Sequence, residues 1–322
     1  MRRFITHEEL ARDSRFVRAR NTTVGAEGLP DDVDTVVAIF EKMAPEIERR
    51  IQGTRLEAIY QDVGPGFQIL SQLGRLGVDE ESTKLQMAAR MHGILVGEMQ
   101  ALEAAGRTTW DFPDLDWGFK MNMARQCWDE ARHVQIYEKL LHHYDGEVGD
   151  YPENTFLFET GCADDPVLRV TGVNRCIEGL ACDVFRDLVE TGKRTGDEIL
   201  EQAVDYVLAD ELTHVRFGSD WSKAYTADDP DRRERTKAFQ RETERNFAFG
   251  GRRQIAHQDR REAGFSEEEL EELEHIFQDV RESGPSTETL ISAAEKLRDR
   301  HRARQSGETV APIEIPAAPS SR

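Results

Sequence analysis

The chain has 322 residues, a formal net charge of −20 and 38% hydrophobic residues. This length allows a large buried core in one or two domains, while the negative charge disfavours a general nucleic-acid-binding surface. No stretch of 18 apolar residues and no apolar leader stand out, and the four cysteines lack zinc-type spacing, so a cytoplasmic protein with reduced thiols and no membrane span is expected.

The hydrophobic pattern predicts an all-α chain. Glu, Arg, Leu and Ala dominate, and no strand-like run of six or more residues occurs. The turn-rich segment 145–166 is longer than an ordinary connection between helices. In chain order, helices are expected over 31–52, 67–76, 80–106, 115–143, 167–191, 198–224 and 232–261. One or two short helices follow, beginning at the capping box of Ser266 and Glu269.

Two of these predicted helices place a glutamate and a histidine three residues apart. Asp-Glu-Ala-Arg-His at 129–133 contains Glu130 and His133, and Asp-Glu-Leu-Thr-His at 210–214 contains Glu211 and His214. Residues at this spacing share one face of a helix. Two such units, together with one glutamate from each of two further helices, make the di-metal carboxylate site of helical bundles.

Two glutamates in the preceding helices complete this set. Glu98 has only apolar neighbours one and two turns away, whereas Glu103 lies beside polar residues and is expected to be exposed. Glu178 likewise interrupts an apolar face, and a buried glutamate requires a partner or a metal. Glu98 precedes Glu130 by 32 residues and Glu178 precedes Glu211 by 33, which indicates a duplicated arrangement.

Simpler interpretations than a di-metal site also exist for these residues. A third Glu-x-x-His, Glu272 to His275, lies in an acid-rich segment that is typical of a solvated helix face. The two main pairs could also be polar contacts in a core without metal. For Tyr137 and Phe185, core packing is favoured over a radical or substrate role, and His92 is expected to be an ordinary histidine on another face. Cys127, Cys176 and Cys182 are expected to be small core residues.

The motif at 129–133 resembles the Asp-Glu-x-Arg-His motif of the ferritin-like di-iron carboxylate oxygenases. The segments 97–103 and 210–218 are most similar to a bacterial ferritin-like family of mostly unassigned function, related to the tRNA-hydroxylase branch. The resemblance covers about 80–225. It implies a ferritin-like four-helix bundle with additional flanking N- and C-terminal helices.

The resemblance also implies the roles of individual residues. One metal would be bound by Glu98, Glu130 and His133, and the other by Glu178, Glu211 and His214, with one glutamate of each half bridging. Asp129 and Asp210 would orient the imidazoles, and Arg132 would hold the aspartates. Four carboxylates balance two ferrous ions, and this set of oxygen and nitrogen ligands suits two iron ions or a manganese–iron pair.

The expected function is that of an O2-dependent di-iron monooxygenase-like enzyme. The enzymes it resembles hydroxylate or N-oxygenate a substrate, here a small organic molecule. A ferredoxin or reductase would supply electrons, because no flavin, nicotinamide or iron–sulfur motif is seen, and a homodimer is expected. The alternatives are a ferritin-like iron-binding or peroxide-detoxifying protein, and a tRNA-modifying hydroxylase whose RNA contacts would come from Arg252-Arg253 and Arg260-Arg261.

Four parts of the chain are expected. Residues 1–79 form an arm and flanking helices, and 80–226 form the di-iron bundle. Residues 227–306 are charged helices that pack on the bundle, and 307–322 are a disordered Pro/Ala-rich tail.

Overall fold

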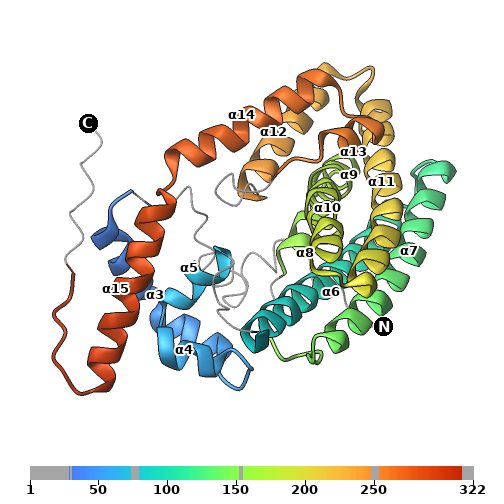
Figure 1. Cartoon of the computed structure of the whole chain (residues 1–322). Coiled ribbons are helices and arrows are strands. Elements are labelled where there is room, and N and C mark those ends of the chain that lie inside the picture. Colours follow the sequence, from blue (N-terminus) through green and yellow to red (C-terminus); the bar gives the residue numbers. More distant parts are fainter. Residues whose placement is uncertain (1–28, 30, 74–79, 152–154, 248–253, 314–322) are drawn as a thin grey trace, which may run out of the picture. The chain divides into compact units, whose positions relative to one another are not determined.

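The computed structural model describes residues 29, 31–73, 80–151, 155–247 and 254–313. Within these ranges every regular element is a helix and there is no strand (Figure 1), so the prediction of an all-α chain is confirmed. No helix in the described part of the chain has the length and apolar character needed to cross a membrane. The predicted arm, up to residue 28, and the tail from 314 onward lie outside the described residues.

The chain divides into two compact units, each built from several segments. Among the described residues, the first unit comprises 94–140, 155–247 and 254–280, and the second comprises 29, 31–73, 80–93, 141–151 and 281–313. The predicted four-part division of the chain stays a prediction.

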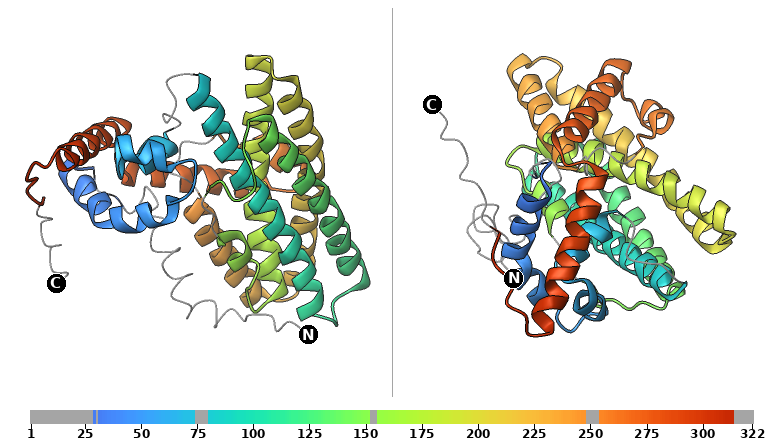
Figure 2. Two further views of the ribbon diagram at one scale, coloured as in Figure 1. Left: turned by 90° about the horizontal axis from the view of Figure 1, so that it is seen from below. Right: turned by 60° about the vertical axis from the view of Figure 1, so that its left-hand side comes forward.

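The first unit is organised by four long helices that lie side by side (Figure 2): α6 (Glu80–Asp111) from Ile94 onward, α7 (Trp117–His143) as far as Leu140, α10 (Glu178–Thr195) and α11 (Glu198–Thr226). The connection between α10 and α11 is short because Gly196 adopts a left-handed conformation with φ of 75° and Asp197 caps α11 by accepting a hydrogen bond from Leu200 N.

The predicted single α-helix over 167–191 is wrong. The structure has α9 (Pro166–Val170), the seven-residue π-helix η2 (Thr171–Ile177) and then α10. Close packing accompanies this segment: a Cβ atom on Gly218 of α11 would lie 2.7 Å from Asn174 Cβ and 3.0 Å from Arg175 N. A π-helix has a wider turn than an α-helix, and such segments are frequent at functional sites. Here it ends directly before Glu178.

The predicted single helix over 232–261 is also wrong. It is divided into α12 (Pro230–Phe247) and α13 (His257–Glu262). Gly250 and Gly251 stand between them in the sequence, and a glycine in the interior of a helix destabilises that helix. α12 packs on η2, and α13 packs on α10 and α11. The first unit also contains α8 (Phe156–Thr160) and most of α14 (Glu267–Ser283).

The capping box at the start of α14 is confirmed. Ser266 N donates to Glu269 Oε2 at 2.8 Å, and Glu269 N donates to Ser266 Oγ at 3.2 Å. The helices after this box, α14 and α15 (Thr287–Gln305), have 17 and 19 residues and are therefore longer than expected.

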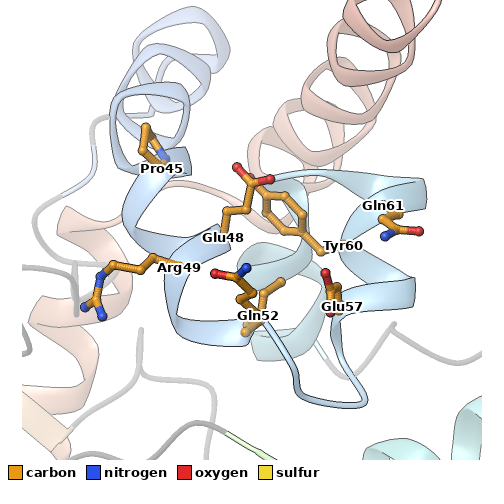
Figure 3. A pocket seen from close by; sticks show the side chains of 8 residues that line it. Pro45, Glu48, Arg49, Gln52, Glu57, Tyr60 and Gln61 are labelled. Atoms are coloured by element: carbon orange, nitrogen blue, oxygen red, sulfur yellow. The ribbon is translucent and has the colours of Figure 1, made fainter.

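In the second unit, α15 packs against α3 (Val33–Ile51), α4 (Glu57–Val63) and α5 (Gly66–Gln72). Arg300 of α15 forms a two-pronged ion pair with Glu41 of α3, with nitrogen–oxygen distances of 2.7 and 2.9 Å. Figure 3 shows a hollow of about 290 Å³ at α3 and α4, where Glu48, Glu57 and Tyr60 are among the lining residues. His92, also in this unit, is buried and accepts a hydrogen bond from Gly149 N at 3.0 Å, as an ordinary core histidine would.

Candidate metal centre

Six acidic and histidine side chains meet in the interior of the first unit. Glu98 comes from α6, Glu130 and His133 from α7, and Glu178 from the first turn of α10; Glu211 and His214 come from α11. Their exposed fractions lie between 0 and 5%. The sequence-predicted ligands are thus all brought together, from four helices.

These side chains form two overlapping groups, each of which could hold a metal ion. One group contains Glu98, Glu130, His133 and Glu211, and the other contains Glu130, Glu178, Glu211 and His214. In each group the possible ligand atoms lie within 4.8 Å of one another. Glu130 and Glu211 belong to both groups, so one glutamate from each half occupies the shared position.

Both imidazoles direct Nδ1 toward the carboxylates. His133 Nδ1 lies 3.0 Å from Glu130 Oε2, 3.1 Å from Glu211 Oε1 and 3.5 Å from Glu98 Oε2. His214 Nδ1 lies 3.0 Å from Glu211 Oε2 and 3.3 Å from Glu130 Oε1. A neutral imidazole would bring a lone pair to the same small volume as the carboxylate oxygens, which is the arrangement that a cation stabilises.

The other ring nitrogen of each histidine faces an aspartate of the opposite motif. His133 Nε2 lies 3.3 Å from Asp210 Oδ2, and His214 Nε2 lies 3.3 Å from Asp129 Oδ2. An aspartate at this position accepts the Nε2 proton, which fixes the tautomer that leaves Nδ1 free for a metal. The preceding Asp in each motif therefore orients the histidine of the other half.

Arginine side chains hold these two aspartates. Arg132 Nη2 donates to Asp210 Oδ2 at 2.9 Å and also contacts Asp129, so one guanidinium joins both halves. Arg125 Nε donates to Asp129 Oδ2 at 3.2 Å. Burial would raise the pKa of Asp129, but His214 and Arg132 outweigh it and lower the pKa to about 2.

Without a bound metal ion, the six side chains differ in the protonation state that they favour. Burial raises the pKa of Glu98 and of Glu178 well above the usual range of a carboxyl group. Burial acts in the same direction on Glu130 and Glu211, yet the neighbouring imidazoles lower the pKa of both. The imidazoles in turn have pKa values raised far above normal by the carboxylates, although burial opposes this. The outer glutamates thus favour the protonated form, and the shared pair favours the anionic form between two imidazoles that favour the protonated form.

Two amide side chains that sequence reasoning missed complete the polar surroundings of Glu178. Gln126 Nε2 donates to Glu178 Oε1 at 3.0 Å and to Glu130 Oε1 at 3.1 Å. Gln126 Oε1 accepts from Asn174 Nδ2 of η2 at 2.8 Å. Gln126 and Asn174 each lie four residues before a ligand glutamate on the same helix face, a spacing that could have revealed them.

The remaining sequence candidates lie elsewhere. Glu272 of the third Glu-x-x-His is half-buried and pairs with Arg241, and His275 is exposed and belongs to neither metal group of the described residues. Tyr137 is fully buried with its ring 5.6 Å from that of Phe185, as core packing predicts. All four cysteines are free thiols, and Cys176 and Cys182 are buried.

The expected arginine patch for RNA is contradicted at Arg260. This side chain is fully buried: its Nη2 donates to Asp183 Oδ2 at 2.9 Å and its Nη1 to Glu244 Oε1 at 3.3 Å. Arg261 is exposed but pairs with Glu267 at 2.6 Å. The composition of the segment suggested a surface, whereas the partners of Arg260 lie 77 and 16 residues away in the sequence. Arg252 and Arg253 lie outside the described residues.

Comparison with known proteins gives a family but no described activity. No curated protein and no solved structure matches the chain. A family model with the description "Protein of unknown function (DUF455)" matches residues 67–271, which include all six side chains of the two metal groups. Because this match covers more than half of the 322 residues, the chain belongs to the DUF455 family.

Proposed function

We propose that this chain is an O2-dependent di-iron oxidoreductase with a ferritin-like four-helix bundle, which hydroxylates or N-oxygenates a small organic substrate. The observation that carries the proposal is the pair of overlapping buried groups that share Glu130 and Glu211. Two metals bridged by carboxylates, with one histidine each, is the arrangement of di-iron carboxylate sites in helical bundles. The resemblance of the 129–133 motif to the di-iron oxygenases supports iron.

The chain's own residues would perform four tasks in this proposal. Glu98 with His133, and Glu178 with His214, would each hold one iron, and Glu130 and Glu211 would bridge the pair. The aspartates keep the imidazole protons on Nε2. The buried walls exclude bulk water, which protects reactive oxygen chemistry from side reactions. When bound, ferrous iron would supply the electrons and the O2-binding positions.

Electrons for repeated turnover would come from a partner in this proposal. A monooxygenase reaction consumes two electrons beyond those that the substrate supplies, and a ferredoxin or reductase is the proposed donor. Iron storage and peroxide detoxification use the same ligand types. Storage is separated from the proposal by the iron stoichiometry, and peroxide detoxification by consumption of hydrogen peroxide in place of O2. The alternative of a tRNA-modifying hydroxylase is weakened, because Arg260, one of the arginines expected to contact RNA, is buried.

The proposal is tested by loading the purified chain anaerobically with ferrous iron and then adding O2. We expect two iron ions per chain, rapid O2 consumption, and loss of both in Glu130→Ala and Glu211→Ala, since each variant lacks a carboxylate of both groups. Glu272→Ala is the matched control, because it removes the glutamate of a Glu-x-x-His that belongs to neither metal group. Unchanged iron content in both site variants would refute the site, and many irons per chain would favour storage.

A further inference from the structure

A cavity of about 160 Å³ lies against the two outer glutamates of the metal centre. Glu98 and Glu178 are the acidic residues that line it, and they come from α6 and α10. All its other lining residues are glycine or apolar, among them Ile94, Ala101, Leu157, Ile177, Leu180 and Phe185. The histidines, which come from α7 and α11, are absent from this lining, so the cavity borders the carboxylate side of the centre.

The residues that line the cavity range from half-buried to buried. Gly97, Ala181 and Val184 are half-buried, whereas Ala101 and Phe185 are buried together with the two glutamates. The half-buried residues, which come from α6, α8 and α10, form the rim of the cavity, and the two carboxylates belong to its buried part. A molecule that enters past the rim would therefore reach the metal centre directly.

The size and lining of this cavity determine the chemical class of molecule that fits. An apolar cavity of about 150 Å³ in another protein binds benzene. A polar group placed among these apolar walls would lose its hydrogen bonds to water without replacement, and an anion would lose still more of its hydration free energy. Burial of apolar surface is the main attraction that the walls offer.

We infer that the cavity binds an uncharged apolar molecule, or an uncharged apolar end of one, about the size of benzene or toluene. Its role as the substrate site rests on the proposed function, whereas its ability to bind such a molecule does not. The inference thus narrows the substrate from small organic molecules to hydrocarbon and aryl groups presented to the carboxylate side of the two metals.

Two glycines of α6 provide a matched pair of variants. A Cβ atom on Gly97 or on Gly93 would meet nothing within 4 Å, so a larger side chain fits at either position without displacing the backbone. Gly97 lines the cavity, while Gly93, one turn earlier, is exposed. Replacing glycine by leucine raises the helix propensity equally at both sites. The two variants therefore differ in that only Gly97→Leu places a side chain in the cavity.

The experiment titrates toluene into the full chain by calorimetry, with benzoate as a charged probe of similar shape. We expect toluene to bind, benzoate to bind much more weakly, and Gly97→Leu to weaken toluene binding by at least about tenfold because leucine takes up the space. Gly93→Leu should bind toluene like the unmodified chain. Ala181→Leu, on the opposite wall, is a second blocking variant in case Gly97→Leu does not fold.

Metal content measured on the same samples separates this inference from the proposed function. In the cobalt-loaded chain, toluene protons should relax faster than in the zinc-loaded chain, since the cavity adjoins both outer ligands. Absence of toluene binding in a chain that holds two metals would overturn the cavity inference alone. Toluene binding in a chain that takes up no metal would instead contradict the proposed function. Equal toluene affinity in the Gly97 and Gly93 variants would place the binding outside this cavity and overturn the inference.

Discussion

Metal binding to this chain should release about four protons for each pair of divalent ions. Glu98 and Glu178 hold protons because burial raises their pKa, and the carboxylates raise the pKa of His133 and His214 despite burial. All four side chains must lose these protons to bind metal. Two divalent cations add four positive charges, and the four released protons take four away. The net charge of the buried cluster is therefore the same with and without metal.

The magnitude follows from linkage between protons and metal. Each proton released changes the free energy of metal binding by about 1.4 kcal/mol per pH unit, so four protons give up to about 5 kcal/mol per unit. Without metal, the raised pKa values stabilise the fold at low pH. The histidine contribution is complete below the usual value of 6.5 and the glutamate contribution below 4.5, and both are lost as pH rises. The metal-free chain should therefore lose stability with rising pH, and metal affinity should increase.

Calorimetry in buffers with different ionisation enthalpies measures this proton release directly, at pH 7 and with zinc or cobalt to avoid oxidation. Glu178→Gln, which resembles the protonated glutamate in shape, should lower the release by about one proton. Glu103→Gln, an exposed carboxyl group on α6, should leave it unchanged. Release of fewer than about two protons, or a metal affinity independent of pH, would refute the assigned protonation of the cluster.

Three further outcomes are expected. Arg260→Met should lower the free energy of unfolding in urea by about 3–5 kcal/mol because it leaves a buried carboxylate without its partner, whereas Arg261→Met at the exposed pair should leave it almost unchanged. Asp210→Asn should weaken metal binding by about 10- to 100-fold in a chelator competition, because the imidazole loses its negatively charged hydrogen-bond acceptor. Gly218→Ala should lower the thermal midpoint because its Cβ atom would crowd η2, while Gly93→Ala, with open space around it, should not.

The buried cluster of glutamates and histidines was predictable because the surroundings of its members in the sequence distinguish them from similar residues. Glu98 and Glu103 lie on the same helix, and only Glu98 has an apolar neighbourhood; in the structure Glu98 is buried and Glu103 exposed. Glu272 has the same spacing to a histidine as Glu130, yet its acidic neighbours predict a solvated helix face, and 42% of its side chain is exposed in the structure. Helical periodicity and local composition carry this information within a few turns.

Features that depend on distant residues were not predictable in this way. The π-helix η2 has no distinct period in the sequence, and its packing involves Gly218 on another helix. Arg260 lies in a segment rich in arginine and glutamate, and its burial depends on Asp183 and Glu244. A single sequence shows neither pairing, because tertiary contacts override local composition.

The two halves repeat their candidate ligands but differ in the residue four positions before each outer glutamate. Four residues before Glu178 stands Asn174, which donates to Gln126, and Gln126 in turn donates to Glu178. Four residues before Glu98 stands Ile94, which lines the cavity instead. Both outer glutamates line the cavity, but the Gln126 amide also holds Glu178, so Glu178 is the more firmly oriented of the two. In the proposed enzyme, Glu98 is therefore the outer glutamate that would move more readily when a molecule enters the cavity.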